Sequence, residues 1–489
     1  MNLVVVSNRL PFAVTRDEDG QWRVEAGSGG LVTALRPVLG HRGGRWIGWS
    51  GATAEEMPDV AALFEGSERR FGYELVPVSL TVAERDGFYS GFSNQIVWPL
   101  FHDLVSLANF DPAYWQVYES VNERFAEAIA RTAAPDDLVW VHDYHLMRVA
   151  TALAARGARF RTAFFLHIPF PPLDGFLKLP WRFQLLRSLL DFDLVGFQTV
   201  RDLRNFVQCV RLLLPDADVE GRGAVWTVRF AGRELRIGSF PIAIDAAEFA
   251  RRAETHEVAA KVADIRAAEP GRRLVLGIDR LDYTKGLPQK LEAFRRFLRR
   301  RPERRGTVTL IQVVVPSRED IRRYQEHKTL VDRLVGEING EFSRGGWAPI
   351  HYLHRGLEGY RLYAYYRAAD VALVTPLKDG MNLVSKEYCA TRSDGGGALI
   401  LSEFAGAAAE LQRGAFLVNP FDVDGVADAL EAALAMPVRE QRARMRRLRR
   451  VVRERNIYRW LDTFLRAAAG HDLSDFPLVE DYLPAAARP

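Results

Sequence analysis

Short apolar runs alternate with longer amphipathic segments along most of the chain. One set of runs lies near residues 3, 137, 162 and 193, and a second set lies near residues 272, 308, 348, 370 and 398. Apolar runs separated by helix-length segments are typical of βαβ units and a parallel sheet. Between the two sets, residues 215–240 predict turns and short strands instead. The pattern therefore predicts two α/β halves joined near Pro241.

The predicted fold class is α/β, with two Rossmann-like parallel-sheet domains that face a central cleft. A chain of 489 residues exceeds what one hydrophobic core usually serves. We expect residues 1–240 to form the first domain and residues 241–455 the second. Residues 456–489 form a C-terminal helix and tail, and the helix could pack on either half. A cleft between two domains is the usual place for an active site.

The segment DGMNLVSKE, residues 379–387, is the most informative motif in the second half. If a strand ends near Val374 and a helix begins near Asn382, free amides at the helix start favour an anion. Asp379 can accept a hydrogen bond from a sugar hydroxyl, and Glu387, about two turns into the helix, can reach a ribose diol. In the alternative, Asp379 only caps the helix and Glu387 lies on a solvated face. The first interpretation predicts a site for a sugar nucleotide.

Two cations follow another apolar run of the second half. Arg280 and Lys285 lie in GIDRLDYTKG, directly after LVLGI, so both are expected at the exit of a strand. Such cations can clamp a pyrophosphate and stabilise the negative charge that grows on a departing nucleoside diphosphate. The alternative is an exposed Arg and Lys on a turn.

In the first half, Arg9 ends the first apolar run, and residues 28–30 form a small-residue turn before a helix-like segment. The backbone can approach a ligand closely at Gly29 and Gly30. The sequence GSGG is also typical of an ordinary flexible loop. The turn is therefore a weak indication of a binding site.

Aromatic and polar side chains gather in three further segments of the first half. Aromatic faces can stack on the C–H groups of a sugar while charged groups bind its hydroxyls and phosphate. Each residue alone is more often structural, and Tyr89 and Trp98 could simply be core residues. The segments FYSGFSNQIVWP, HDYH and FLHIPFP supply Tyr89, Trp98, His142, Asp143, His145 and His167.

Composition excludes several classes of protein. Hydrophobic content of 48% and charged content of 26% are ordinary for a globular chain. The formal net charge of +4 does not imply nucleic acid. The nine arginines between Arg439 and Arg455 are interrupted by apolar residues at helical spacing, which favours a solvated helix face. The chain lacks the roughly 20 apolar residues in a row that a bilayer requires, and its start does not resemble a signal peptide. We therefore expect a soluble protein without a membrane partner.

Cysteine and histidine usage gives no indication of a metal or disulfide. Cys209 and Cys389, the two cysteines of the chain, lie far apart in the sequence, which favours a reducing cytoplasm. No partner carboxylate or cysteine lies at metal spacing from the HDYH segment. We therefore expect no metal and no cofactor.

A series of ordered motifs resembles the trehalose-6-phosphate synthases, retaining glycosyltransferases of the GT-B architecture. The resemblance spans essentially residues 1–470, and its specificity comes from the number and order of the motifs. They are VVVSNR, GSGGL, WIGWSG, FYSGFSNQIVWP, VWVHDYHL, FFLHIPFP, GFQT, DRLDYTKG, PSRED, EINGEF, LVTPLKDGMNLVSKEY and LSEFAGAAAEL.

The resemblance implies transfer of glucose from a nucleoside-diphosphate glucose, UDP- or GDP-glucose, to glucose 6-phosphate. The product is α,α-trehalose 6-phosphate, formed with retention of configuration. No carboxylate nucleophile is evident in the sequence. The family is thought to use front-face attack, in which the departing phosphate oxygen takes the proton of the acceptor.

The resemblance also implies roles for individual residues at the donor site, most of them in the second, donor-binding domain. Arg280 and Lys285 would hold the diphosphate, and Glu387 the ribose. Arg280, Lys285, Asp379 and His167 are implied in catalysis. The implied donor site comprises Gly29, Gly30, Arg280, Lys285, Asp379, Gly380, Met381, Asn382, Leu383 and Glu387, and His167 would also contact the donor glucose.

The first domain is implied to bind the acceptor. The phosphate of the acceptor would be held by Arg9 and Tyr89, together with Arg318 from the PSRED motif of the second domain. The acceptor sugar would be lined by Trp49, Trp98 and Asp143.

Two other functions stay open from the sequence. One is a related transferase with another phosphorylated acceptor, such as a glucosylglycerol-phosphate synthase or a pseudo-glycosyltransferase that joins cyclitols. The other is a non-catalytic sensor of sugar phosphate, which we expect to lack a donor-site cation or acid. The sequence does not fix the nucleotide base, and a homo-oligomer is possible.

Overall fold

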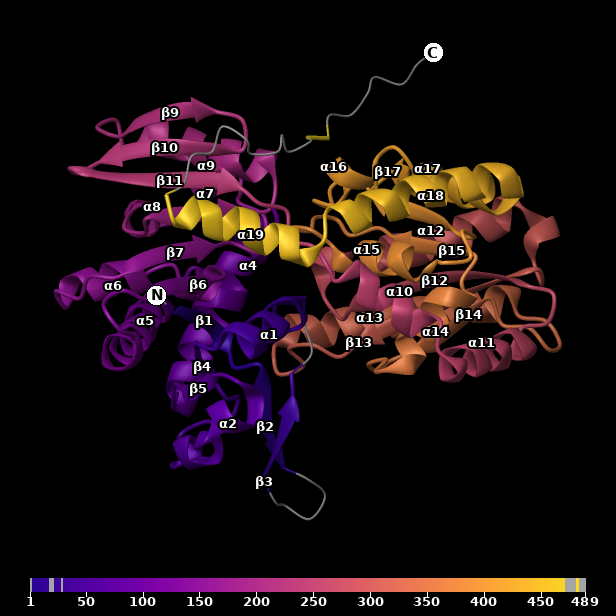
Figure 1. The fold of residues 1–489 in the computed structure, drawn as a ribbon. Helices are drawn as coiled ribbons and strands as arrows, with labels where there is room; N and C mark the ends of the chain where they lie inside the picture. Colours follow the sequence, from indigo (N-terminus) through magenta and orange to yellow (C-terminus); the bar gives the residue numbers. More distant parts are fainter. Residues whose placement is uncertain (1, 17–21, 28–29, 471–480, 483–489) are drawn as a thin grey trace. The chain divides into compact units, whose positions relative to one another are not determined.

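The computed structural model describes residues 2–16, 22–27, 30–470 and 481–482 (Figure 1). These residues divide into two compact units. The first takes in the described residues up to Ile242 together with those from Trp460 to Gly470, and the second takes in Ala243–Arg459 together with residues 481–482. Each unit is built on its own sheet.

The sheet of the first unit has the order β5-β4-β1-β6-β7-β8-β11-β10-β9. Every pairing from β5 to β11 is parallel, whereas β10 is antiparallel to both β11 and β9. The strands are β1 (Leu3–Arg9), β4 (Arg45–Trp49), β5 (Glu74–Pro77), β6 (Leu138–His142), β7 (Arg161–Phe165), β8 (Leu194–Phe197), β9 (Asp218–Arg222), β10 (Val225–Phe230) and β11 (Arg233–Ser239). A separate hairpin pairs β2 (Phe12–Arg16) with β3 (Trp22–Ala26).

The helices of the first unit are α1 (Gly30–Arg42), α2 (Ser67–Phe71), α3 (Val82–Glu84), α4 (Trp98–Phe101), α5 (Pro112–Thr132), α6 (Val149–Ala155), α7 (Leu173–Phe176), α8 (Arg182–Leu190), α9 (Val200–Leu213) and α19 (Ile457–Ala468). Helices α1 to α9 lie between the strands of this unit in the sequence, and α19 belongs to the unit from Trp460 onward. A π-helix, Arg85–Val97, precedes α4.

The second unit has a sheet of order β14-β13-β12-β15-β16-β17, and all its pairings are parallel. Its strands are β12 (Arg273–Arg280), β13 (Val308–Val315), β14 (Ile350–Leu353), β15 (Val371–Val374), β16 (Ala398–Ser402) and β17 (Phe416–Val418). Its helices are α10 (Ala246–Ala253), α11 (His256–Ala268), α12 (Leu287–Arg300), α13 (Arg322–Phe342), α14 (Tyr360–Ala368), α15 (Leu383–Thr391), α16 (Ala408–Leu411), α17 (Val423–Ala435) and α18 (Val438–Glu454).

Both sheets follow the same doubly wound path. In each, the chain starts at a central strand, moves outward over two strands, then returns to the other side of the first strand. The order reverses between β1 and β6 in the first unit and between β12 and β15 in the second. The predicted Rossmann-like class is confirmed for each unit. The turns and short strands expected in residues 215–240 are also confirmed, and they extend the first sheet.

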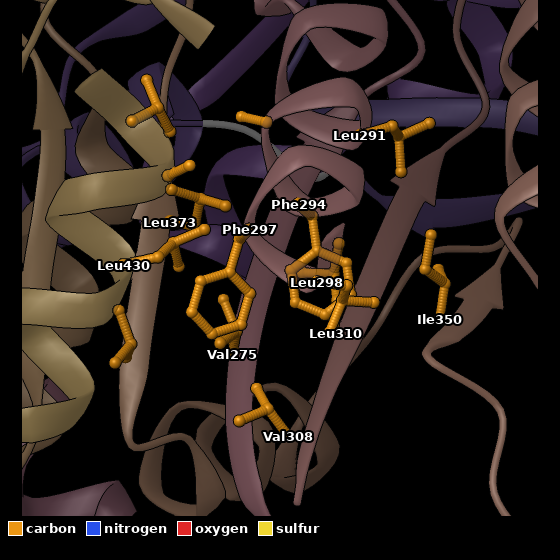
Figure 2. Close-up of a cluster of buried hydrophobic side chains, with 14 of the residues drawn as sticks. Val275, Leu291, Phe294, Phe297, Leu298, Val308, Leu310, Ile350, Leu373 and Leu430 are labelled. Atoms are coloured by element: carbon orange, nitrogen blue, oxygen red, sulfur yellow. The ribbon is translucent and has the colours of Figure 1, made fainter. Parts of the chain in front are cut away.

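The strands of the second unit are continuous apolar runs in the sequence because they lie in the hydrophobic core of that unit. Phe294 and Phe297 of α12 point toward the sheet, where they meet Val275 of β12 and Leu310 of β13 (Figure 2). All four are essentially inaccessible to solvent. A parallel strand covered on both faces has no polar face to present, which is why the pattern alone located it.

The two C-terminal helices are amphipathic. On α18, Met445, Leu448 and Val452 are buried, whereas four of its arginines, Arg446, Arg447, Arg450 and Arg453, are exposed, which confirms the solvated basic face. Helix α19 packs on the first unit: its Phe464 ring stacks on Trp140 with centroids 4.4 Å apart. The indole N–H of Trp460 donates to the carbonyl of Phe240 at 3.1 Å.

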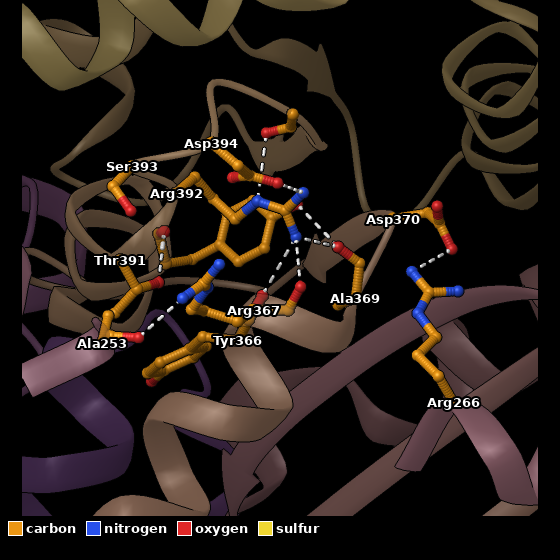
Figure 3. Close-up of polar contacts among 12 residues, drawn as sticks. Ala253, Arg266, Tyr366, Arg367, Ala369, Asp370, Thr391, Arg392, Ser393 and Asp394 are labelled. Atoms are coloured by element: carbon orange, nitrogen blue, oxygen red, sulfur yellow. Dashed lines mark hydrogen bonds and ion pairs between the residues drawn. The ribbon is translucent and has the colours of Figure 1, made fainter. Parts of the chain in front are cut away.

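Arg392, just after α15, ties the end of α14 to the start of β16 (Figure 3). Its guanidinium donates to the carbonyls of Arg367 at 2.7 Å and Ala369 at 2.6 Å, and its Nε donates to the carbonyl of Gly396 at 3.1 Å. It also pairs with Asp394 at 2.8 Å. One buried cation therefore satisfies several carbonyls that the helix leaves without intrahelical partners.

We expect Arg392→Ala to lower the free energy of unfolding of the second unit by about 3 kcal/mol, because charged hydrogen bonds are lost and buried carbonyls stay unpaired. Hydrogen exchange of the β15 amides measures this loss, since β15 lies in the core of that unit. Arg450→Ala, at an exposed position of α18, is the control and should change protection little. A loss below about 1 kcal/mol in Arg392→Ala would contradict the role assigned to the guanidinium.

Candidate functional site

The predicted ligand residues lie at the carboxyl ends of strands beside the two points where the sheet order reverses. Arg9 ends β1 and His142 ends β6 in the first unit. Arg280 ends β12, and Asp379 follows β15, in the second. Ligands of open α/β sheets bind at these edges. Each unit therefore carries predicted ligand residues at the reversal point of its own sheet.

In the second unit, Lys285 and Asp379 form an ion pair. Lys285 ends the short 3₁₀ turn after β12, and its Nζ lies 2.7 Å from Asp379 Oδ2. The side-chain amide of Asn382 donates to the same oxygen at 3.1 Å. Both charged side chains are only slightly exposed, 11% and 17%. The loops after β12 and β15 thus present one cation and one acid to the same place.

The expected strand and helix around Asp379 are confirmed, since β15 ends at Val374 and α15 begins at Leu383. The cap of the helix is Asn382, whose side-chain oxygen accepts from the amide of Ser385 at 3.1 Å. The alternative in which Asp379 merely caps the helix is therefore wrong.

The two loops are fastened to each other by the backbone. The amide of Leu377 donates to the carbonyl of Thr284 at 2.8 Å. Gly286 adopts a φ of 64°, and an added Cβ there would lie 2.8 Å from the carbonyl oxygen of Thr375. Only glycine combines this conformation with so close an approach. The cation and the acid are held on rigid supports.

Glu387 is the fifth residue of α15, a little over one turn into the helix rather than about two. It is half-buried, not solvated. It accepts a hydrogen bond from the hydroxyl of Tyr366 at 2.7 Å. Burial raises the pKa of Glu387 above its ordinary value, although the bond from Tyr366 opposes this. The solvated-face alternative for Glu387 is therefore wrong.

Three cations surround the buried carboxylate of Asp282. Burial alone would raise its pKa, but the positive charges of Arg318, Arg280 and Lys285, with the amide of Thr284, lower the pKa to about 2. Arg280 is exposed at the end of β12. Arg318, in the loop after β13, contacts Asp282 through Nη1 at 3.2 Å. The sequence interpretation gave this carboxylate no role of its own, although the DRLDYTKG motif contains it.

In the first unit, the Arg9 guanidinium lies on the ring of Trp49, 3.9 Å from its centroid, and 5.9 Å from that of Tyr89. Such stacking fixes a cation without consuming its hydrogen bonds. Desolvation lowers the pKa of Arg9, but a guanidinium stays charged at neutral pH. Gly51 has a φ of 106°, which favours glycine, and an added Cβ there would lie 2.1 Å from Arg9 Nη1, so another residue would displace the guanidinium.

Tyr89 lies in the π-helix, a rare element that is frequent at functional sites. Its ring stacks on that of His145, with centroids 5.9 Å apart and planes 10° apart. Asn94 anchors this segment: it donates to the carbonyl of Tyr89 at 2.8 Å and accepts from the hydroxyl of Tyr144 at 2.8 Å. Arg9 and Tyr89 are thus brought together as the sequence predicted.

Asp143 connects the ends of β6 and β7. It adopts a left-handed φ of 74°, and its Oδ1 accepts from the amide of His167 at 3.2 Å. The rings of His142 and His167 are hydrogen-bonded, with Nδ1 of the former 3.1 Å from Nε2 of the latter. Burial lowers the pKa of His167 to about 3 and that of His142 well below its ordinary value. Both rings are neutral at neutral pH.

Lowering the pH from about 7 to about 4 is expected to destabilise the protein through this histidine pair. In the unfolded chain both rings bind protons near pH 6.5, whereas in the folded protein the pKa of His167 is about 3. The unfolded state therefore binds more protons in this window, and the free energy of unfolding falls as the pH falls. Urea denaturation across the window measures the fall.

The matched variant for this pH dependence is His142→Phe, which keeps a ring at the buried position. We expect its stability to fall less steeply than that of the wild type between about pH 6.5 and pH 4. Comparing each protein with its own stability at about pH 8 removes any change in packing. Equal slopes would show that the pair does not titrate as described.

The remaining predicted site residues differ in exposure and in position in the fold. Trp98 is 4% exposed and packs against His102 and Tyr144, as expected of a core residue. Gly30 is the first residue of α1, whereas Gly29 lies outside the described residues. In the loop after β15, Gly380 and Met381 are buried, and Leu383, the first residue of α15, is half-buried.

Within the described ranges, no group of three or more His, Cys, Asp or Glu side chains could hold a metal ion. The same part of the chain contains no helix with the length and apolarity that a membrane span needs.

Comparisons with known proteins point to one family. The model of glycosyltransferase family 20 matches residues 1–469. The chain is 46% identical over 478 residues to a trehalose-6-phosphate synthase of Mycolicibacterium gilvum (strain PYR-GCK), covering 96% of this chain and 94% of the relative.

Solved structures are similar over the same extent. An α,α-trehalose-phosphate synthase (UDP-forming) from Burkholderia xenovorans, in complex with glucose-6-phosphate, has a TM-score of 0.87 and 37% identity, covering 96% of this chain and 100% of that one. A structure from E. coli bound with UDP-2-fluoro glucose has a TM-score of 0.85 and 35% identity, covering 96% and 99%.

Proposed function

The chain belongs to glycosyltransferase family 20, and from this premise we propose that it is a trehalose-6-phosphate synthase. It transfers glucose from a nucleoside-diphosphate glucose to glucose 6-phosphate, with retention, and forms α,α-trehalose 6-phosphate. The observation that carries the proposal is the pairing of Lys285 with Asp379 at 2.7 Å, at the reversal point of a doubly wound sheet. A site for an activated sugar needs a cation for the diphosphate and an acid for sugar hydroxyls in one place.

The second unit binds the donor. Arg280 and Lys285 hold the diphosphate, so that the negative charge on it is stabilised as the bond to the anomeric carbon breaks. Asp379 accepts from a glucose hydroxyl, and Glu387, held by Tyr366, binds the ribose. The proposed donor contacts from the surrounding backbone are those of Gly29, Gly30, Gly380, Met381, Asn382 and Leu383.

The acceptor is bound through its phosphate by Arg9, Tyr89 and Arg318, and its sugar contacts Trp49, Trp98 and Asp143. Arg9 suits this role because its guanidinium is already ordered on Trp49, which reduces the entropy lost on binding. Phosphate oxygens match the planar donors of arginine. Selection of a phosphorylated sugar therefore rests on two guanidiniums and one phenol.

The chemistry requires no carboxylate nucleophile. In the proposed front-face step, the bond between glucose and the diphosphate breaks, the acceptor oxygen bonds to the same anomeric carbon, and the acceptor proton passes to the departing phosphate oxygen. His167 is neutral because burial lowers its pKa to about 3, so it contacts the sugar as a neutral hydrogen-bonding group. The protein supplies orientation and fixed charge.

The test is product formation from each of UDP-, GDP- and ADP-glucose with a panel of acceptors: glucose 6-phosphate, glucose, glycerol 3-phosphate and a cyclitol phosphate. We expect transfer to glucose 6-phosphate to be fastest with at least one donor. Preference for another phosphorylated acceptor would identify a related transferase. Sugar-phosphate binding with no transfer from any donor would identify a sensor.

The cellular setting is proposed on a separate ground. Cys209 and Cys389 are both free and buried, as expected in a reducing compartment, so we place the reaction in the cytoplasm. A homo-oligomer stays a prediction, which light scattering of the purified protein tests.

A further inference from the structure

Asp282 uses its two carboxylate oxygens for two different purposes. Oδ1 accepts from the amide of Thr284 at 2.9 Å and from its hydroxyl at 2.8 Å. These bonds cap the 3₁₀ turn that ends at Lys285. Oδ2 lies 3.2 Å from Nη1 of Arg318 and 3.4 Å from the hydroxyl of Tyr324. The carboxylate is fully buried, so neither set of bonds competes with water.

Arg318 needs such support. Its backbone has a φ of 52°, which non-glycine residues rarely adopt, and its side chain is only 6% exposed. The same guanidinium nitrogen that meets Asp282 also donates to the hydroxyl of Tyr324, on α13. Two partners, one in the loop after β12 and one on α13, therefore fix one long side chain, which would otherwise sample many rotamers.

We propose that Asp282 is a positioning residue that holds Arg318 in place for the phosphate of the acceptor while it fixes the turn that carries Lys285. This inference rests on the proposed function, because Arg318 binds the acceptor phosphate there. Asp282 touches neither substrate. It makes the donor cation and the acceptor cation of the second unit depend on one buried carboxylate.

The charge of this carboxylate persists over the working range of an enzyme. The nearby cations keep the pKa of Asp282 at about 2, so the residue neither gives nor takes a proton during catalysis. Its role is therefore that of a fixed counter-charge, which the neutral amide of asparagine cannot replace.

The experiment uses Asp282→Asn in the full chain. The amide oxygen of asparagine can still accept from Thr284, but an amide NH₂ then faces the guanidinium of Arg318. We expect KM for glucose 6-phosphate to rise about tenfold or more, while KM for the sugar nucleotide and kcat at saturating acceptor change by less than about twofold. With glucose as acceptor, kcat/KM should change by less than about twofold, because no phosphate remains to be held.

Equal losses with glucose 6-phosphate and glucose would overturn the proposal, since a purely structural residue affects both acceptors alike. Combining Asp282→Asn with Arg318→Ala should cost no more than Arg318→Ala alone. Additive losses would also overturn it. Arg333→Ala, at an exposed position of α13, is the control.

A second variant tests the proposal if Asp282→Asn does not fold. Tyr324→Phe keeps the ring but removes the hydroxyl that meets both Asp282 and Arg318, and we expect KM for glucose 6-phosphate to rise about threefold with glucose unaffected. An unchanged KM would overturn the proposal. Failure of the proposed function is distinguishable, because the wild type would then not prefer glucose 6-phosphate to glucose at all.

Discussion

Lys285→Ala is expected to lower the rate of glucosyl transfer by at least about tenfold, equivalent to about 1.4 kcal/mol of lost transition-state stabilisation. The Lys285 ammonium lies 2.7 Å from Asp379 in a slightly exposed position, where a charge acts more strongly than in water. Its loss removes a cation from the departing diphosphate and leaves Asp379 without its partner. Steady-state kinetics with saturating glucose 6-phosphate measure the effect.

Arg280→Ala is expected to act in the same direction by a similar factor, because both cations face the same diphosphate in the proposed site. Lys261→Ala is the matched control, since Lys261 lies on α11 and pairs only loosely with Asp264 at 3.4 Å. Circular dichroism shows whether each variant keeps its fold. Wild-type turnover in folded Lys285→Ala and Arg280→Ala would refute the diphosphate clamp.

The features that could be predicted from the sequence are those that the local pattern of apolar and polar residues determines. The end of β15 at Val374 and the start of α15 at Leu383 follow from an apolar run, a Pro-Gly segment and an amphipathic segment. The positions of Arg280 and Asp379 at the carboxyl ends of strands follow from the same alternation. Because a doubly wound sheet brings such ends together, the placement of the residues that we propose for the donor could be predicted without coordinates.

Contacts between distant segments could not be predicted in this way. Nothing local shows that Asn382 rather than Asp379 caps α15, since both are good capping residues. The bond of Asp282 to Arg318 joins positions 36 residues apart, and that of His142 to His167 joins positions 25 apart. Both depend on which strands are neighbours, and the alternation of runs does not give strand order. Asp282 could have been identified as a candidate from its motif, because it lies between Arg280 and Lys285, the two predicted cations.

Asp143→Ala is expected to slow transfer to glucose 6-phosphate by about tenfold or more, while hydrolysis of the sugar nucleotide in the absence of acceptor changes by less than about twofold. Asp143 follows β6 at the reversal point of the first sheet and is proposed to bind the acceptor sugar. The proposed donor residues Arg280, Lys285 and Asp379 belong to the second unit. His167 loses only the acceptor of its backbone amide, so the acceptor reaction should be affected selectively. Parallel assays of transfer and hydrolysis measure the two rates.

Two variants separate the carboxylate of Asp143 from its unusual backbone. Asp143 has a φ of 74° and a ψ of 165°, a region nearly confined to glycine, so Asp143→Ala and Asp143→Asn both keep the backbone strain of the wild type, and Asp143→Asn can still accept from the amide of His167. Asp103→Ala is the control for alanine at another positive φ, because Asp103 is exposed and has a φ of 62° in the same unit. If the charge binds the acceptor, Asp143→Asn should lose transfer nearly as strongly as Asp143→Ala, and Asp103→Ala should not. Equal losses of transfer and hydrolysis in both Asp143 variants would instead make Asp143 a structural residue that fixes the end of β7.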